Sequence, residues 1–429
     1  MTDLEVVEIC AGAGGQALGL ERAGFEHALA VELDASACAT LRANRPGWKV
    51  AQGDVADRDV WEPGAYAGVS LLAGGVPCPP FTVAGRQLGA ADERDLFAWA
   101  VELCARIRPR ALLLENVRGL SQQRFGAYRQ HVLDRLRELG YAPGWQLLHA
   151  SDFGVPQLRP RSVLVAVQAA DAPWFRWPAP APAEVPPPTV GETLHDLMGA
   201  RGWPGADRWA ERASGIAPTI VGGSKKHGGA DLGPTRAKRA WAELGVDGLG
   251  LADEPPGPDD DPALRPRLTC EMVARLQGWQ DDWGWEFTGR KTARYRQVGN
   301  AFPPPVAEAV GHAIRRALVH EGEPLPLADA SAHVDDPVFA VLRGRDEFLT
   351  AADIAAAVQA AGAAHARPGP RLSGPAVLRR LADLGRDFHL ETTAGREGTA
   401  YRLGDFKAFL GQVDHVRHEQ FSLSRSRIS

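Results

Sequence analysis

A thiol and a carboxylic acid, each placed directly after an apolar run, could together perform nucleophilic catalysis. Cys78 stands in the string GGVPCPPFT, and Glu115 stands in the string ENV. Apolar residues 71–73 and 111–114 lead into these strings, which is typical of strands that end at a site. Ligands of open α/β sheets bind beyond the carboxyl ends of the strands, so two neighbouring strand ends would bring a nucleophile to an acid. The prolines around Cys78 exclude a helix and predict a stiff loop that presents the sulfur.

These side chains need a sheet that delivers several strand ends to one edge, and residues 1–173 predict one. An apolar run over 4–10 stops at a glycine-rich loop, which a helical pattern follows. Glu32 ends a second strand about twenty positions past the loop, where nucleotide-binding folds hold ribose hydroxyls. Asp54 follows a third strand end, and helices are predicted over 96–107 and 129–139. This alternation predicts an α/β fold, a Rossmann-like doubly wound and mostly parallel sheet.

An ordered series of motifs resembles the DNA (cytosine-5)-methyltransferases over roughly residues 4–315. The series begins with EICAGAGG at Glu8 and continues through the GGVPCPPFT and ENV strings. It then runs through QLRPR at Gln157 and RLQG at Arg275, and it closes with QVGNA at Gln297. The resemblance implies a Rossmann-like S-adenosylmethionine-dependent methyltransferase core with a small irregular target-recognition domain.

The resemblance also implies a covalent reaction on a cytosine ring. The Cys78 thiolate would attack C6, which makes C5 nucleophilic enough to accept a methyl group. Glu115 would act at N3 as an acid, which requires a raised pKa. Arg161 is expected to contact the cytosine O2. The residues expected to brace this site are Asn116, Gln157 and Arg159.

A binding site for S-adenosyl-L-methionine follows from the same resemblance. The backbone of residues 12–15 would lie along the methionine part, Glu32 would bind the ribose hydroxyls and Asp54 the adenine amino group. Cys10 stands where the family usually has an aromatic residue, so adenine stacking must come partly from elsewhere. The full predicted set is Cys10, Ala11, Gly12, Gly14, Gly15, Glu32, Asp54, Val55, Pro77, Asn300 and Ala301.

Double-stranded DNA is the expected partner, although the formal net charge of the chain is -5. Phosphate binding depends on local positive charge more than on the total, and residues 201–245 are locally basic. A base inside a duplex must be flipped out to reach Cys78, and this region is expected to read the flanking bases. Its tryptophans (Trp203, Trp209, Trp241) are expected to form its core. The residues predicted to contact DNA are Lys225, Lys226, His227, Arg236, Lys238 and Arg239.

Changes in composition divide the chain into further parts. A proline-rich connector and the recognition domain fill 174–265, and residues 266–321 return the chain to the catalytic core. Two helices and a hairpin over 338–412 resemble a winged-helix module of α+β type, with a helical appendage as an equal alternative. Residues 413–429 are a polar tail, expected to be flexible.

Composition excludes several classes of protein. No apolar stretch reaches the roughly 18 residues of a membrane span. The five cysteines are scattered, so neither a disulfide frame nor a metal site is expected, which favours the cytoplasm, at the bacterial nucleoid. A monomer is expected, either in a restriction-modification system with a cognate restriction endonuclease as a candidate partner or as a solitary genomic methylase. Three alternatives remain open: an RNA (tRNA) cytosine C5 methyltransferase, a non-catalytic DNA-binding regulator, and a flavin or nicotinamide oxidoreductase.

Overall fold

The computed structural model describes residues 4–77, 96–182, 184–223, 229–326, 336–364, 372–395 and 398–406. Cys78, Lys225, Lys226, His227 and the predicted tail lie outside the described residues. The chain forms two compact units. The first comprises residues 1–76, 109–116 and 145–324, and the second comprises 77–108, 117–144 and 325–429.

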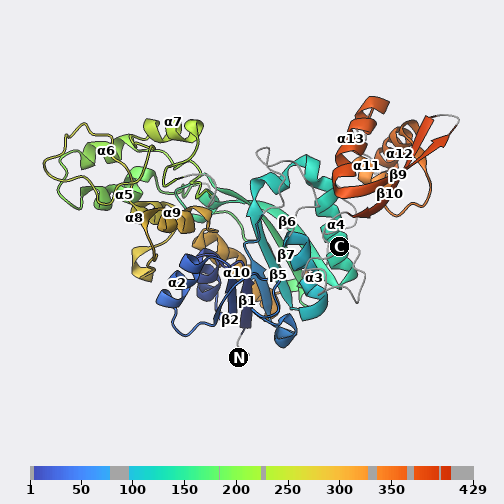
Figure 1. The fold of residues 1–429 in the computed structure, drawn as a ribbon, viewed down its shortest axis with the longest axis horizontal. Coiled ribbons are helices and arrows are strands. Elements are labelled where there is room, and N and C mark those ends of the chain that lie inside the picture. Colours follow the sequence, from blue (N-terminus) through green and yellow to red (C-terminus); the bar gives the residue numbers. More distant parts are fainter. Residues whose placement is uncertain are drawn as a thin grey trace. The chain divides into compact units, whose positions relative to one another are not determined.

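Seven strands form one sheet in the order β3-β2-β1-β4-β5-β7-β6 (Figure 1). The pairs β1–β2, β1–β4, β2–β3 and β4–β5 are parallel, which confirms the predicted α/β fold. Only β6 has no counterpart in the prediction, because Pro143 and Gly144 interrupt its apolar pattern. The strands are β1 (Leu4–Ile9), β2 (Phe25–Glu32), β3 (Val50–Gln52), β4 (Leu71–Gly74), β5 (Ala111–Val117), β6 (Tyr141–His149) and β7 (Pro160–Gln168).

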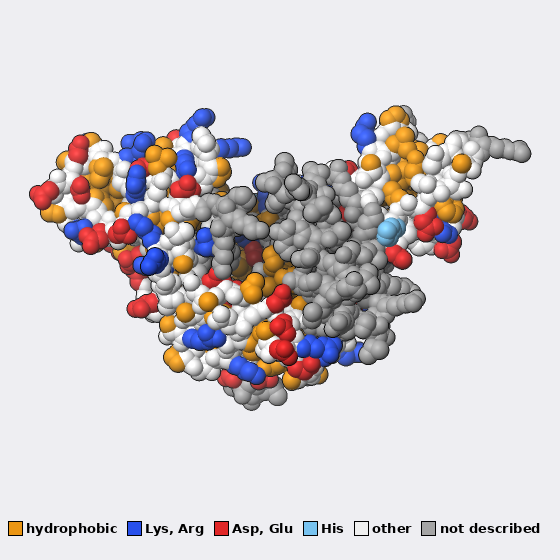
Figure 2. Space-filling view, viewed as in Figure 1, with side chains coloured by type: hydrophobic (Ala, Val, Ile, Leu, Met, Phe, Trp, Pro, Cys, Tyr) orange, Lys and Arg blue, Asp and Glu red, His pale blue; other side chains and the backbone are white. Residues whose placement is uncertain are grey.

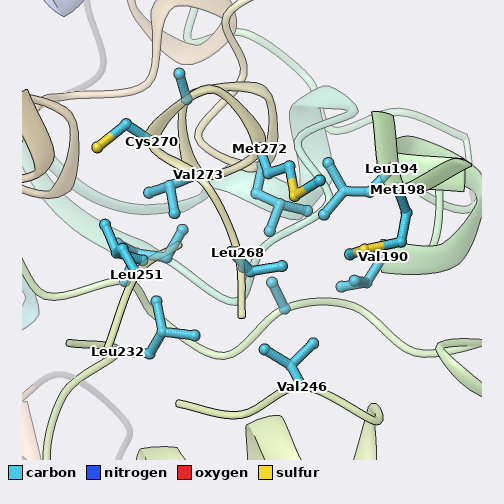
Figure 3. Packing of buried hydrophobic residues seen from close by; sticks show 14 of the residues in the cluster. Val190, Leu194, Met198, Leu232, Val246, Leu251, Leu268, Cys270, Met272 and Val273 are labelled. Carbon is cyan, nitrogen blue, oxygen red and sulfur yellow. The ribbon is translucent and has the colours of Figure 1, made fainter. Parts of the chain in front are cut away.

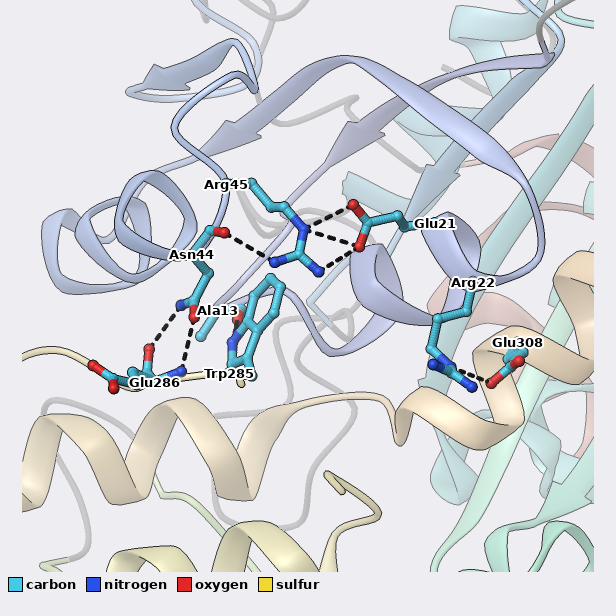
Figure 4. Close-up of polar contacts among 8 residues, drawn as sticks. All are labelled: Ala13, Glu21, Arg22, Asn44, Arg45, Trp285, Glu286 and Glu308. Carbon is cyan, nitrogen blue, oxygen red and sulfur yellow. Dashed lines mark hydrogen bonds and ion pairs between the residues drawn. The ribbon is translucent and has the colours of Figure 1, made fainter. Parts of the chain in front are cut away.

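Three helices of the first unit belong to the Rossmann-like part: α1 (Gly15–Arg22), α2 (Ala35–Asn44) and α10 (Pro304–Leu318). Helix α10 packs against α1, and the two backbones meet at Gly19. A Cβ on Gly19 would lie 2.5 Å from the carbonyl oxygen of Pro304, so a larger side chain has no room. An ion pair of 2.8 Å between Arg22 and Glu308 also joins the helices (Figure 4). The C-terminal part of the predicted catalytic region thus returns to its N-terminal part.

The recognition region has its own apolar core. Val190, Leu194 and Met198 of α5 meet Met272 and Val273 of α8 in this core (Figure 3). Trp203, Trp209 and Trp241 are buried in the same cluster, as predicted. The helices of this region and of the return to the catalytic part are α5 (Val190–Gly199), α6 (Ala206–Arg212), α7 (Thr235–Glu243), α8 (Cys270–Leu276) and α9 (Lys291–Asn300).

In the second unit, α3 (Leu96–Ile107) and α4 (Gly126–Glu138) precede a C-terminal α+β module. Its antiparallel sheet has the order β8-β10-β9. Asp336 caps the first helix of the module and forms an ion pair with Arg380. Arg343 forms an ion pair of 3.0 Å with Asp134 of α4. The module comprises α11 (Pro337–Leu342), β8 (Leu349–Thr350), α12 (Ala351–Ala364), α13 (Gly374–Asp387), β9 (Phe388–Gly395) and β10 (Gly398–Phe406).

Short 3₁₀ turns connect many of these elements. They are Pro63–Tyr66, Arg118–Ser121, Gln123–Phe125, Ala150–Phe153, Ala172–Trp174 and Asp281–Trp283. Among the described helices, none has the length and apolarity needed to cross a membrane.

Candidate active site

The register of the parallel strands brings four predicted site segments to one edge of the sheet. Ile9 pairs with both Val31 and Gly74, and Gly74 pairs with Leu114. The residues that follow these positions therefore emerge together at the carboxyl ends of the strands. They are Cys10, Glu32, Gly75 and Glu115.

The glycine-rich loop after β1 is held by Glu32. Gly12 N donates to one carboxylate oxygen of Glu32 at 2.8 Å, and Asp34 N donates to the other at 2.7 Å. Cys10, Gly12 and Gly14 all have positive φ, and a Cβ added at Gly12 would meet nothing within 4 Å. Burial raises the pKa of Glu32. The loop thus exposes backbone beside an acceptor group.

This edge fits the nucleoside end of S-adenosylmethionine. A carboxylate has about four acceptor positions. The two backbone hydrogen bonds to Glu32 leave acceptor capacity for a pair of ribose hydroxyls. Asp54 lies after β3, and its carboxylate accepts from Ala56 N at 2.9 Å, with Val55 buried beside it. Cys10 is half-buried, so it offers little stacking surface.

Trp285 also contacts the glycine-rich loop, at Ala13 and Gly14 (Figure 4). Its indole nitrogen donates to Ala13 O at 3.1 Å, and a Cβ on Gly14 would lie 2.3 Å from its ring. The guanidinium of Arg45 lies 5.1 Å from the ring centroid. Asn44 and the backbone of Glu286 exchange two hydrogen bonds of 2.7 and 2.8 Å. The chain segment around Trp285 therefore holds both the glycine-rich loop between β1 and α1 and the end of α2.

Glu115 and Arg161 form a buried ion pair across neighbouring strands β5 and β7. Arg161 Nε lies 2.5 Å from Glu115 Oε1, and both side chains are less than one-tenth exposed. Burial raises the pKa of Glu115, while Arg161 and Arg159 oppose that rise. A carboxyl group of raised pKa is suited to donate or share a proton near neutral pH. Burial beside an arginine is the environment that the predicted role of Glu115 requires.

The loop that leads to Cys78 begins beside this acid. A Cβ on Gly75 would lie 3.6 Å from Glu115 Oε2, so the backbone passes close to the carboxyl group. Asn116 Nδ2 donates to Val76 O at 3.1 Å, which gives Asn116 the bracing contact that was predicted. Pro77 is exposed, and Cys78 itself lies outside the described residues.

Gln157, Arg159 and Gln277 form a different cluster, which we call the buried node. Arg159 donates to the carbonyls of Ile220, Gly299 and Ala301 at 2.7, 2.8 and 2.9 Å. Gln157 bonds Gln277 Oε1 at 2.6 Å and accepts from Ile220 N at 2.9 Å. All three node side chains are essentially inaccessible to solvent. The node therefore holds the loop that contains Gln157 and Arg159, which is the bracing role expected of these two residues.

Asn300 and Ala301, which were predicted to bind the cofactor, lie next to the buried node. Ala301 O accepts from both Arg159 and Gln277 Nε2, the latter at 2.7 Å. Asn300 is exposed, and its side-chain amide donates to Gly223 O at 3.1 Å. The two residues lie next to the glycine-rich loop, because a Cβ on Gly15 would come within 2.9 Å of the Ala301 side chain.

The described candidates for DNA contact differ in their exposure and in their ion pairs. Arg236 and Arg239 are exposed on α7, in the lobe where Figure 2 shows Lys and Arg side chains on the surface. Lys238, in contrast, is committed to Asp231 by an ion pair of 2.9 Å. Arg236 and Arg239 are therefore better candidates for phosphate contact than Lys238.

Sequence reasoning missed Gln277, Tyr295 and Trp285 as parts of the site. Gln277 belongs to the RLQG motif, which served the sequence analysis only as part of the family resemblance. Arg275 of the same motif ties α8 to α5, through Asp196 at 2.5 Å. Tyr295 OH donates to Val221 O at 3.1 Å. The only signal for Trp285 was the aromatic density of residues 279–287, which fits a local core equally well.

The cysteines and carboxylates of the described segments build no inorganic site. Cys10, Cys38, Cys104 and Cys270 are free thiols. No cluster of histidine, cysteine and acidic side chains suited to a metal ion occurs in the described part of the chain.

Comparison with known proteins adds an independent result. The family model for C-5 cytosine-specific DNA methylases matches residues 4–316. The chain is 62% identical to the type II methyltransferase M.NaeI of Lentzea aerocolonigenes over all of both chains. It is 49% identical to M.NgoMIV of Neisseria gonorrhoeae, over 73% of this chain and 98% of that protein.

A solved structure agrees at the level of the fold. A prophage-encoded candidate DNA modification methyltransferase from E. coli matches 74% of this chain and all of its own, with a TM-score of 0.50 and 22% identity. At that identity the match supports the fold alone, whereas the family match and the relatives extend to the enzyme class. The chain therefore belongs to the C-5 cytosine-specific DNA methylase family, and is a DNA cytosine-5 methyltransferase with S-adenosylmethionine as its methyl donor.

Proposed function

We propose that the enzyme methylates a flipped cytosine through a covalent bond between Cys78 and C6 of the base. The bond from sulfur to C6 forms first, and the ring electrons that it displaces are stabilised by a proton shared between Glu115 and N3. C5 would then take the methyl group, while the bond from that group to the donor sulfonium breaks and leaves a neutral thioether. Water would take the C5 proton, the electrons of the C5–H bond would restore the C5–C6 double bond, and the bond from C6 to sulfur would break to release the Cys78 thiolate.

The observation that carries this proposal is the Glu115–Arg161 pair at the edge where the loop to Cys78 begins. A buried carboxyl of raised pKa can hold a proton at N3 when negative charge develops. Arg161 beside it would contact the cytosine O2, since a guanidinium presents several N–H donors in a fixed plane. The two side chains together would orient the base by its polar edge.

The cofactor supplies an electrophilic methyl group on a sulfonium centre. The residues that would hold it are those of the glycine-rich loop, with Glu32 at the ribose and Asp54 at the adenine amino group. Asn300 and Ala301 would line the site beside the glycine-rich loop, where Ala301 lies next to Gly15. Trp285 would keep the loop in its binding conformation.

We propose that duplex DNA lies against the basic recognition region. Arg236 and Arg239 would anchor phosphates, together with Lys225, Lys226 and His227, which precede α7 in the sequence. Flipping one nucleotide costs a few kcal/mol of unstacking, which contacts of this kind must offset. Lys238 would then serve the structure of the region through Asp231 rather than the DNA.

The biological setting we propose is the modification half of a type II restriction-modification system. Both relatives described above carry the name type II methyltransferase, and the first spans this whole chain. A cognate restriction endonuclease is then the expected partner of the system. We propose that the enzyme acts as a monomer at the bacterial nucleoid in the cytoplasm.

The domain boundaries given from the sequence remain our proposal, with 338–412 as a winged-helix-like module. Its element order of helix, strand, two helices and hairpin supports that assignment. Thr350 and Ser373 cap its second and third helices. Because the family model ends at residue 316, the module is an addition to the methyltransferase.

Bisulfite sequencing of DNA from cells that express the protein tests the proposal. Cells with the wild-type chain should carry 5-methylcytosine at one recurring sequence, and cells with Cys78→Ser should carry none. The methylated DNA should also resist a nuclease that cuts at that sequence. Equal methylation by the wild type and Cys78→Ser would refute the covalent route.

A further inference from the structure

Residues 217–223, which we call the recognition segment, lie within the recognition region. Backbone hydrogen bonds hold the start of this segment. Ala217 N donates to Pro156 O at 2.9 Å, and Leu158 N donates to Ala217 O at 2.7 Å. These bonds form a short parallel bridge between Gln157 and Ala217. The segment therefore begins in register with the residues that lead to Arg161.

The same segment is also clamped at its end, by helix α9. Tyr295 OH donates to Val221 O, and Asn300 Nδ2 donates to Gly223 O, each at 3.1 Å. Arg159 joins the two parts directly, because one guanidinium bonds Ile220 O together with Gly299 O and Ala301 O. The recognition segment and the cofactor-side loop are thus bound to the same side chain.

Between these clamps the two backbones touch at a pair of glycines. A Cβ on Gly299 would lie 2.6 Å from both Cα and N of Gly222. A Cβ on Gly222 would lie 2.6 Å from Asn300 Oδ1 and 2.8 Å from Arg296 O. Gly299 lies inside α9, where glycine is about 1 kcal/mol less favourable than alanine, so the close approach explains its presence. The recognition segment and the end of α9 are therefore in direct backbone contact, with no room for a side chain between them.

We propose that this Gly222–Gly299 crossing couples DNA binding to cofactor binding. The inference rests on the proposed function, which places DNA on the recognition side and the cofactor beside Asn300 and Ala301. DNA that fixes the recognition segment also fixes the end of α9, so each ligand tightens the binding of the other. Such coupling is reciprocal, and typical factors are about 5 to 150. Gly222, Gly299 and Tyr295 are positioning residues in this account.

A thermodynamic cycle on the full-length protein tests the coupling. The DNA is a duplex that carries the site found by bisulfite sequencing, and S-adenosylhomocysteine stands in for the cofactor. The dissociation constant of the duplex is measured with and without S-adenosylhomocysteine, and that of S-adenosylhomocysteine with and without the duplex. The wild type should show the same factor, at least fivefold, in both directions.

Gly299→Ala should reduce this factor to below twofold. Gly199→Ala is the matched control: Gly199 also lies at the end of a helix, α5, but its added Cβ would meet Ala206 at an ordinary 3.4 Å. The control should keep the wild-type factor. If Gly299→Ala does not fold, Tyr295→Phe replaces it, because it removes only the hydrogen bond to Val221 and should at least halve the factor.

Three results overturn the inference: an unchanged factor in Gly299→Ala, an unchanged factor in a folded Tyr295→Phe, or a wild type that binds the two ligands independently. In the last case bisulfite sequencing still reports methylation, so the proposed function stands while the coupling fails. A wild type that methylates no cytosine in duplex DNA refutes the proposed function instead.

Discussion

Arg159 and Arg161 are two residues apart and both buried, yet they have different environments. Arg159 bonds three backbone carbonyls, and both burial and Arg161 lower its pKa. Arg161 meets a carboxyl group whose protonation can change. A guanidinium among carbonyls fixes the backbone, whereas a guanidinium beside a buried acid controls a proton. The buried node is therefore a structural region, and the Glu115–Arg161 pair is a reactive one.

The largest expected effect comes from removing the acid. Glu115→Gln keeps the shape of the side chain but cannot supply a proton at N3. A positioned acid contributes about 10²- to 10⁴-fold to the rate, so kcat should fall by that factor. Single-turnover methyl transfer at saturating DNA measures it.

Glu102 provides a control for this substitution. It is also a buried carboxylate bound by an arginine, Arg135, at 2.9 and 3.0 Å, but it lies on α3 outside the candidate site. Glu102→Gln should leave kcat within about threefold while lowering the free energy of unfolding by roughly 1–3 kcal/mol. An equal loss of kcat in both variants would mean that Glu115 is only structural.

The next largest effect separates the two arginines. Arg159→Met leaves the carbonyls of Ile220 and Gly299 without their donor, whereas Ala301 O keeps its hydrogen bond from Gln277. Each buried group without a partner costs about 1–3 kcal/mol, so the free energy of unfolding should fall by about 2 kcal/mol or more, as denaturant titration measures.

Arg161→Met should reverse this pattern, with a small change in stability and a large loss of kcat. It also removes an interaction that lowers the pKa of Glu115, so that pKa should rise further. If Arg161→Met proves the less stable variant and Arg159→Met the less active one, the assignment of the two regions is wrong.

The pH dependence sharpens the comparison with a smaller effect. Since burial raises the pKa of Glu115, the protonated acid persists to higher pH than in water, and kcat should fall only as pH rises through that raised pKa. The Cys78 thiolate requires the opposite change, so the profile of the wild type should be bell-shaped. Glu115→Gln should lose the descending limb. A descending limb that survives this substitution belongs to another group.

The smallest expected effects concern DNA contact on α7. Arg236→Ala and Arg239→Ala should each weaken DNA binding by about 1 kcal/mol and reduce the salt slope by about one. Lys238→Ala should change the salt slope less, because Asp231 already neutralises Lys238. Fluorescence anisotropy over a range of salt concentrations compares the three, and a larger slope change for Lys238→Ala would contradict the assignment.

Much of the fold could be predicted because its strands are short apolar runs bounded by glycine, proline or acidic residues. The helix 96–107 was predicted with the bounds that the structure has, and the tryptophan core of the recognition region was also correct. Strand β6 could not be found, since Pro143 and Gly144 hide its pattern. Local patterns thus predict the elements where packing and propensity agree.

The candidate site was predicted unevenly. Glu115 and Arg161 could be named from motif residues, and so could the bracing contact of Asn116. The contacts of Gln277 and Tyr295 could not, because they join segments more than seventy residues apart along the chain. Such contacts depend on tertiary packing, and one sequence carries no signal for them.

The most direct test of the account is trapping of the covalent intermediate. A duplex with 5-fluorocytosine at the methylated position cannot release its C5 substituent, so the bond between sulfur and C6 should persist after methyl transfer. Incubation with S-adenosylmethionine should give a stable adduct that mass spectrometry locates at Cys78. Methyl transfer to ordinary cytosine without any adduct on the fluorinated duplex, or an adduct at another cysteine, would contradict the account.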